Sequence, residues 1–575
     1  MKKRCFFALL AALLVAGCGG PITEPEPKPE DHDFTVVIGR HDAAAPYTGF
    51  SGGPVWKISS ADYTQGGGTR GITTLSGLDR HSVFLVRVNR SDTEIDALDS
   101  GWAFTRPQGT GSSSERFAVS GPIPAEFPQF QPAGKLILKD DPEAMAFNNG
   151  PAPTQSARWL RDMGTMSTYA LGDTRNFWVQ DENEAWIELP ATLRAESAKA
   201  KVWIADASYS DLLRPNDRLV TTSQAQEIAN KFNLVYGYTT EIFGREPGGP
   251  GAANPGGIDG DAKIHILIYD IDFDQGTGNA NTAGFFWAKD LYAQADINNW
   301  DKHPQTNLAE MFYLDAEFTE FQPKAIYSTL IHEFQHMISY HEKRMVRGLP
   351  GSSNPWYTEM MAMLAEDLIG PQMGIGFDDP GHPAYRWAVE FMVNYSALGV
   401  NKWNTEDLMV SYANAYEFGA YLVRNFGGAA LLKEMASNNY MDTASVNAAL
   451  SSSVNPVPGV RTWQDALGRY GEALIYGNDI YQSDRLSFNR ISETIPFYSF
   501  SAVNLWSRPY RVPNIVNFPA GYRGPLIPSL YYGFGMNAHA LLIQSYTIWQ
   551  NVSGNLEVSF QRPNNPNVDL YIMVR

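Results

Sequence analysis

The segment that most constrains the fold of this 575-residue chain is an apolar helical pattern interrupted by two histidines and a glutamate. Residues 325–338 read AIYSTLIHEFQHMI. Ile326, Leu330 and Phe334 recur at helical spacing, and Pro323 suits the first turn of a helix. We therefore expect a helix that is held in a core.

The two histidines of this helix form a candidate metal site. His332 and His336 are four residues apart, so their side chains lie on one face, about 5–6 Å from each other. Two imidazoles at that separation can bind one tetrahedral zinc ion. Glu333 is rotated by about 100° around the axis, where it can reach a water molecule beside the metal without binding the ion. The alternative is a core helix with two hydrogen-bonded histidines.

A second helix offers the third ligand. Asn354 and Pro355 form a helix start signal, and Gly370 with Pro371 forms a stop signal. Glu359 lies on this helix, 23 residues after His336. A carboxylate there completes three protein ligands and leaves the fourth zinc position open to water. We therefore predict that zinc binds His332, His336 and Glu359, with Glu333 as the general base.

Other candidate ligands fit less well. The extended metzincin pattern needs a Gly and a His where this chain has Ser339 and Glu342. His341 is rotated away from the ligand face. Glu366 and Asp367 are better placed to support a ligand histidine than to bind the metal.

These residues resemble a known family. Residues 332–336 (HEFQH), followed by residues 356–359 (WYTE), resemble the gluzincin clan of zinc metallopeptidases, and within it the hyicolysin family of secreted bacterial peptidases. Three further stretches resemble segments that precede the zinc helix in that family: residues 266–270, 284–287 and 310–315. The resemblance covers roughly residues 205–470. Thr358 departs from the family pattern, where an Asn commonly precedes the glutamate ligand.

The resemblance suggests one more catalytic residue. Residues 415–420 are similar to the Tyr-Glu-x-Gly stretch of aminopeptidase-type gluzincins, in which the tyrosine hydroxyl donates a hydrogen bond to the developing oxyanion. This implies that role for Tyr416, with Tyr412 as its competitor. A core tyrosine on a buried helix is the alternative.

The predicted function is hydrolysis of peptide bonds in extracellular or periplasmic proteins. Zinc activates water and polarises the scissile carbonyl, while Glu333 takes the proton from water and passes it to the leaving amine. By analogy, the strand at residues 283–287 could pair with an extended peptide substrate. Two rival hypotheses remain open: an aminopeptidase, or a non-catalytic surface-binding lipoprotein with a peptidase-like scaffold.

Charge and cysteine content exclude other classes. The chain has 44 Lys and Arg against 62 Asp and Glu, a net charge of −18, which argues against a nucleic-acid partner. Its two cysteines, Cys5 and Cys18, exclude a disulfide scaffold or a cysteine-rich zinc fold. Zinc would therefore be held by nitrogen and oxygen ligands.

The N-terminus resembles that of a bacterial lipoprotein. Residues 1–17 read as a signal peptide with a basic start and a short apolar run, and residues 15–18 (VAGC) resemble a lipobox. This predicts lipidation of Cys18 and a membrane anchor, followed by a proline-rich tether over residues 18–33. Gly19 is no obvious retention signal, which favours the outer membrane or cell surface. An ordinary secretory signal is the alternative.

The remaining chain divides into three expected units. Short β-rich runs separated by Gly and Ser turns predict an antiparallel β domain over residues 34–204. Residues 205–475 form the gluzincin-like unit, a mixed sheet plus a helical subdomain, whose first helix would begin at a Ser223–Gln226 capping box. Residues 476–575 return to β-rich runs. The expected fold class is therefore multidomain α+β, with β domains flanking the metallopeptidase domain.

An acidic loop follows the apolar strand at residues 264–269. Asp270, Asp272 and Asp274 are spaced like calcium ligands, but Gln275 and Asn281 occupy key positions of the EF-hand pattern. A non-EF calcium site and a solvated acidic turn both remain open.

Overall fold

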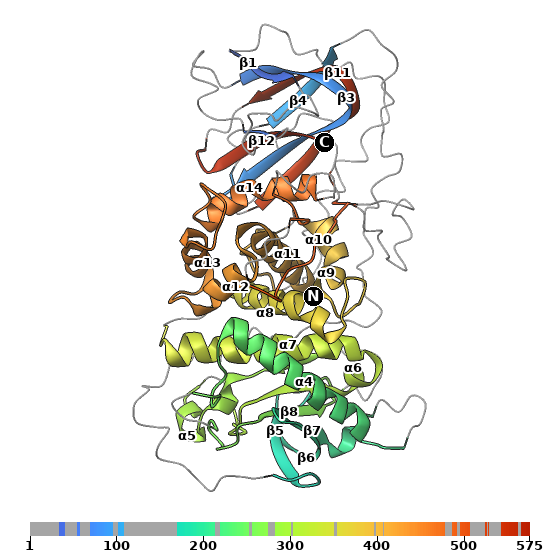
Figure 1. Ribbon diagram of the computed structural model, residues 1–575, viewed down its shortest axis with the longest axis vertical. Helices are drawn as coiled ribbons and strands as arrows, with labels where there is room; N and C mark the ends of the chain where they lie inside the picture. Colours follow the sequence, from blue (N-terminus) through green and yellow to red (C-terminus); the bar gives the residue numbers. More distant parts are fainter. Residues whose placement is uncertain are drawn as a thin grey trace.

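The computed structural model gives an α+β molecule, as expected (Figure 1). It describes residues 34–40, 55–57, 70–95, 102–108, 169–212, 219–251, 256–273, 282–300, 303–349, 353–395, 398–405, 407–477, 486–490, 495–506, 524–525, 527, 542–561 and 565–575. The predicted signal peptide, Cys18 and the tether lie outside these residues. Among the described residues, no helix combines the length and the apolarity that a membrane span requires.

A mixed six-stranded sheet supports the candidate site. Its strand order is β5-β6-β7-β8-β10-β9, with β7, β8 and β10 parallel to one another and the remaining pairs antiparallel. The parallel strands are buried along their length, which agrees with their largely apolar sequences. The strands are β5 (Thr174–Gln180), β6 (Trp186–Glu196), β7 (Ala200–Ala205), β8 (Ile264–Tyr269), β9 (Gly284–Phe286) and β10 (Met311–Asp315).

Two long helices pack against this sheet and against each other. The ring of Phe232 on α4 (Thr222–Phe243) lies 5.7 Å from that of Phe312 in the sheet and 5.0 Å from that of Phe334 on α7 (Pro323–Tyr340). The other elements of this part are η3 (Asp206–Ser208), η4 (Ala288–Leu291), α5 (Gln294–Ile297), α6 (Ala316–Phe321) and the π-helix η5 (His341–Val346). The Phe232 ring thus contacts both the sheet and α7 and helps to fix α7 relative to the sheet.

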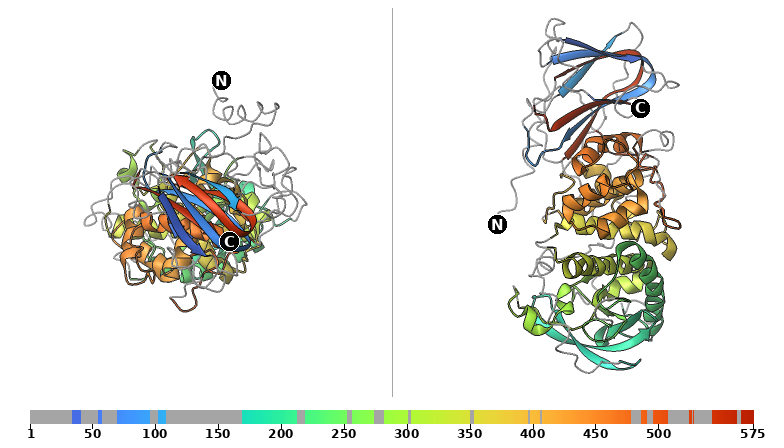
Figure 2. Two further views of the ribbon diagram at one scale, coloured as in Figure 1. Left: turned by 90° about the horizontal axis from the view of Figure 1, so that it is seen from above. Right: turned by 60° about the vertical axis from the view of Figure 1, so that its left-hand side comes forward.

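A helical region follows α7 in the chain. Figure 2 shows it stacked between the mixed sheet with α4 and α7 on one side and a second sheet on the other. Its elements are α8 (Pro355–Ile369), η6 (Gly370–Met373), α9 (Pro383–Arg386), α10 (Ala388–Asn394), α11 (Leu408–Phe426), α12 (Gly428–Ser437), α13 (Asp442–Ser451) and α14 (Trp463–Tyr476).

The second sheet corrects the expected division into two terminal β domains. It joins β1 (Phe34–Arg40), β2 (Val55–Lys57), β3 (Arg70–Asn89) and β4 (Trp102–Gln108) to β11 (Leu542–Gln561) and β12 (Val568–Val574). The order is β2-β12-β3-β11-β4, with β1 pairing parallel to β3. Strands expected in two separate β domains, 34–204 and 476–575, therefore share one sheet. The expected boundary at residue 204 also differs from the structure, because β5, β6 and β7 belong to the mixed sheet.

This second sheet packs on the last helix. A Cβ atom at Gly471 of α14 would lie 2.5 Å from Cγ1 of Val86 on β3, so the glycine permits close contact. The Tyr476 hydroxyl donates a hydrogen bond to the Val574 carbonyl, 3.0 Å away.

Candidate metal centre

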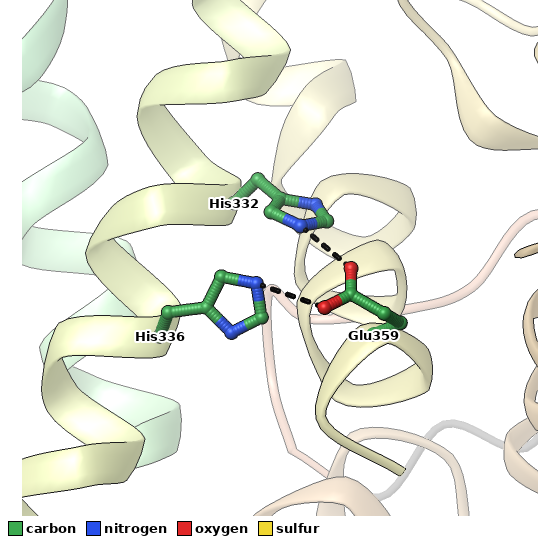
Figure 3. A group of neighbouring side chains, drawn as sticks. All are labelled: His332, His336 and Glu359. Atoms are coloured by element: carbon green, nitrogen blue, oxygen red, sulfur yellow. Dashed lines mark hydrogen bonds and ion pairs between the residues drawn. The ribbon is translucent and has the colours of Figure 1, made fainter. Parts of the chain in front are cut away.

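Three predicted ligands meet between α7 and α8 (Figure 3). Nε2 of His332 lies 3.1 Å from Oε2 of Glu359, and Nε2 of His336 lies 3.5 Å from Oε1 of the same carboxylate. The two imidazole rings are 4.6 Å apart and 76° from coplanar. All three side chains are buried, and their ligand atoms lie within 4.8 Å of one another.

The spacing and chemistry of these atoms fit zinc. Ligands of a tetrahedral zinc ion lie about 2.0–2.1 Å from the metal and so about 3.3 Å from one another. The distances from the two Nε2 atoms to Glu359, one to each carboxylate oxygen, are 3.1 and 3.5 Å. Two imidazole nitrogens and one carboxylate form a donor set that zinc accepts, with room for one further ligand. The cluster that these described residues form offers only nitrogen and oxygen donors.

The two helices begin where the sequence predicts. Pro323 opens α7 and Pro355 opens α8. Asn354 occupies the N-cap of α8, but its side chain does not accept from the helix. Instead it donates to Asp442, 3.2 Å away, whose carboxylate also accepts the Asn354 backbone N–H at 2.7 Å. The start of the Glu359 helix is thus fixed to α13.

Glu366 orients the first ligand histidine. Its Oε1 lies 2.7 Å from Nδ1 of His332, and its Oε2 accepts hydrogen bonds from Ser328 and Arg386. Burial raises the pKa of Glu366, but Arg386 and the hydrogen bonds from His332 and Ser328 outweigh it and hold this pKa at about 2. An ionised carboxylate can only accept, so Nδ1 must donate. A neutral His332 then has its lone pair on Nε2, which faces Glu359.

We predicted that Glu366 and Asp367 support a ligand histidine. The contact with His332 confirms this for Glu366 only. Asp367 forms a separate network: Arg424 holds both of its oxygens, at 2.9 and 3.1 Å. Nε2 of His382 is 3.7 Å from the same carboxylate. Sequence reasoning missed Arg386 and Ser328. The sequence could have indicated Ser328, because it lies one turn before His332 on the same helix. No sequence pattern indicated Arg386.

Glu333 lies next to His332 on α7 and is buried; its role as the general base stays a prediction. His341 is not part of the metal cluster. Its Nδ1 lies 2.7 Å from the backbone carbonyl of Arg245, which agrees with its predicted rotation away from the ligand face.

The structure favours the core interpretation of Tyr416. Its hydroxyl donates to Oδ2 of Asp367, 2.9 Å away, and burial raises its pKa well above the usual value. Its competitor Tyr412 stacks on Trp387, with ring centroids 5.2 Å apart. Gly419, the glycine of the same stretch, has a packing role: a Cβ atom there would lie 2.5 Å from Cγ of Met360 on α8. The contacts described for Tyr416 thus join it to Asp367 and not to the three ligands.

The calcium prediction is not tested by the described residues, because Asp274 lies outside them. Asp272 accepts a hydrogen bond from the Thr282 backbone at 3.1 Å. The nearby Asp315 accepts from the backbone of Ile271 at 3.1 Å and of Phe318 at 3.0 Å. Over the part of the chain that the structure describes, no second cluster brings three such ligand atoms together.

Comparisons with known proteins agree with this geometry. Residues 195–475 match the model of the family described as Peptidase M30. The chain is also 27% identical over 320 residues to the neutral metalloprotease ShpI of Staphylococcus hyicus. That alignment covers 53% of this chain and 63% of the relative, so the chain spans less than two thirds of the length of that protein.

Proposed function

We propose, from the match of residues 195–475 to the Peptidase M30 family model, that this chain is a zinc-dependent peptidase acting on proteins outside the cytoplasm. One observation carries the proposal. Two imidazole nitrogens of α7 face the two oxygens of one buried carboxylate on α8, and a second carboxylate fixes the tautomer of His332. The name of the relative, a neutral metalloprotease, supports the same reaction class.

Each residue of the site would have its own role in the reaction. His332, His336 and Glu359 would hold the metal. A bound zinc ion supplies Lewis acidity, which lowers the pKa of water and polarises a carbonyl. Glu333 would accept the proton of the attacking water on a carboxylate oxygen and pass it to the leaving amine nitrogen. Hydrolysis then consumes one water molecule and leaves a carboxylate and an amine.

An edge strand beside the metal helix offers a place for the substrate backbone. β9 is the last strand of the mixed sheet and pairs only with β10 among the described strands. A Cβ atom at Gly284 would lie 2.7 Å from Cγ2 of Thr329, one turn before His332, so β9 lies directly against α7. An extended peptide could add to this edge by backbone hydrogen bonds.

Metal content tests the ligand set. Purified wild-type protein should contain equimolar zinc, and Glu359→Ala should lose it, because two histidines alone bind weakly. Zinc retained at full affinity by Glu359→Ala would refute the third ligand.

The products test the activity. Mass spectrometry of an unstructured protein digested by the metal-loaded chain should show internal fragments that disappear with chelator and return with zinc. Release of single N-terminal residues would indicate an aminopeptidase instead. No cleavage, despite bound zinc, would favour the non-catalytic surface-binding lipoprotein.

The N-terminal sequence supports a proposed location. A basic start, a short apolar run and the VAGC sequence ending at Cys18 are typical of a lipidated export signal. We therefore place the mature protein on the outer membrane or cell surface, held by acyl chains. Cys18→Ser should move the protein from the membrane fraction to the soluble fraction; an unchanged distribution, with an unmodified mature N-terminus, would favour an ordinary secretory signal.

A further inference from the structure

Arg386 is a buried arginine that reaches the metal centre from outside the ligand helices. It lies at the end of the short helix α9, and its side chain is 6% exposed. Its Nη2 donates to Oε2 of Glu366 at 2.6 Å and to the carbonyl of Gly381 at 2.6 Å. Glu366 in turn binds His332.

We propose that Arg386 is a positioning residue that sets the affinity and geometry of the metal centre through Glu366 and His332. The proposal rests on the zinc site of the proposed function. The chain of contacts is short and continuous: 2.6 Å from Arg386 to Glu366, 2.7 Å from Glu366 to His332, and 3.1 Å from His332 to Glu359. The first two contacts are between buried groups, where charge-assisted hydrogen bonds are strong.

The two oxygens of Glu366 have different tasks. Oε1 accepts a hydrogen bond from Nδ1 of His332, whereas Oε2 accepts hydrogen bonds from Arg386 and from the Ser328 hydroxyl. Without the guanidinium, the buried carboxylate would keep its desolvation cost and lose its main compensating charge. It would then be free to turn away from its present orientation, and this change weakens its hold on Nδ1. The imidazole would lose its fixed tautomer and its fixed orientation toward the metal.

The neighbouring carboxylate provides an internal comparison. Asp367 follows Glu366 on α8 and has its own arginine, Arg424, which comes from α11. That second pair binds Tyr416 and not a metal ligand. The two arginine–carboxylate pairs are thus adjacent on one helix, but only the pair containing Arg386 touches a ligand. A substitution at Arg424 should therefore disturb packing without changing the metal centre.

A purely structural role for Arg386 is the competing explanation. Its bond to the Gly381 carbonyl could simply fasten the loop before α9 to α8. In that case its loss would lower the melting temperature of the protein but leave the zinc affinity of the folded molecules unchanged.

Zinc affinity, measured by competition with a chromophoric chelator on the full chain, separates the two roles. We expect Arg386→Met to bind zinc about 10–100-fold more weakly than wild type, the range for residues that support metal ligands. Arg386→Lys keeps one charged donor and should stay within about threefold. The visible spectrum of the cobalt-substituted protein should change in Arg386→Met and be restored in Arg386→Lys.

Two controls complete the design. Arg424→Lys alters the adjacent pair, and Lys324→Met removes an exposed ion pair to Asp379, near α9. Both should keep wild-type zinc affinity. If Arg386→Met does not fold, Ser328→Ala replaces it, with a smaller loss expected. Folded Arg386→Met with wild-type affinity and cobalt spectrum would overturn the inference while leaving the zinc site intact; a wild-type chain that binds no zinc would overturn the proposed function itself.

Discussion

Asp315 is a buried carboxylate whose titration makes stability depend on pH. Burial raises its pKa from the usual 3.8 to about 7, although two backbone N–H groups donate to it. The folded protein therefore holds a proton that the unfolded chain releases between pH 4 and 7. The resulting stability is fully present below pH 4 and is lost as the pH rises through 7.

Asp315→Asn should remove this dependence, because the amide does not titrate. Relative to the variant, wild-type protein should lose up to about 4 kcal/mol of unfolding free energy between pH 4 and 7. Urea unfolding of both proteins across this pH range, with zinc removed by chelator, measures the change in unfolding free energy. A difference between wild type and variant that stays constant over this range would contradict the raised pKa.

The cluster of candidate ligands could be predicted because short-range helical geometry encodes it. His332 and His336 share a face whatever surrounds their helix, and Glu359 lies on a helix with clear start and stop signals. Arg386 could not be predicted in the same way. It reaches Glu366 from a four-residue helix that follows an irregular segment, so only the folded chain brings the two together.

At the scale of helices, Asp442 links the start of α8 to α13. Its carboxylate accepts the backbone N–H of Asn354 at 2.7 Å and the hydroxyl of Ser353 at 2.9 Å. Asp442→Ala should lower the unfolding free energy by about 1–3 kcal/mol, because it leaves these donors without their acceptor. Chemical denaturation checks this, with Thr443→Ala as the control one residue along. Equal stability of the two variants would show that this contact does not hold α8.

The start of α4 shows how far local sequence predicts where a helix begins. α4 is present, and the residues predicted to form its apolar face are buried. However, its capping box is Thr221 with Gln224, not the predicted Ser223 with Gln226. Both pairs have the same spacing, so the motif alone does not distinguish them. In the structure, Val220 directly before Thr221 bridges to Tyr209, so the extended chain continues up to Thr221 and the helix starts there.

On the scale of the whole molecule, both ends of the described chain contribute to one sheet. β3 lies between β12 and β11, so its two edges are both covered by strands from the C-terminal part. The alternating sequence predicted strands in both regions, but it carried no information on which strand pairs with which. This is why two separate β domains were expected.

Deletion of residues 542–575 tests this shared sheet. The shortened chain should expose both edges of β3 over residues 83–89, where β12 and β11 cover them, and it should self-associate and become sensitive to trypsin between residues 70 and 95. Size-exclusion chromatography and mapping of the tryptic fragments would show it. A shortened chain that stays monomeric and resists trypsin over these residues would instead indicate an independent N-terminal β domain.

The central claim is that this chain hydrolyses peptide bonds with Glu333 as the base beside a zinc ion. The most direct test compares wild type and Glu333→Gln for cleavage of one unstructured protein, with bound zinc measured in the same samples. Both should bind equimolar zinc, and the variant should cleave about 100–10,000-fold more slowly, because an amide cannot accept the proton. A variant that binds zinc and cleaves at the wild-type rate would contradict the mechanism.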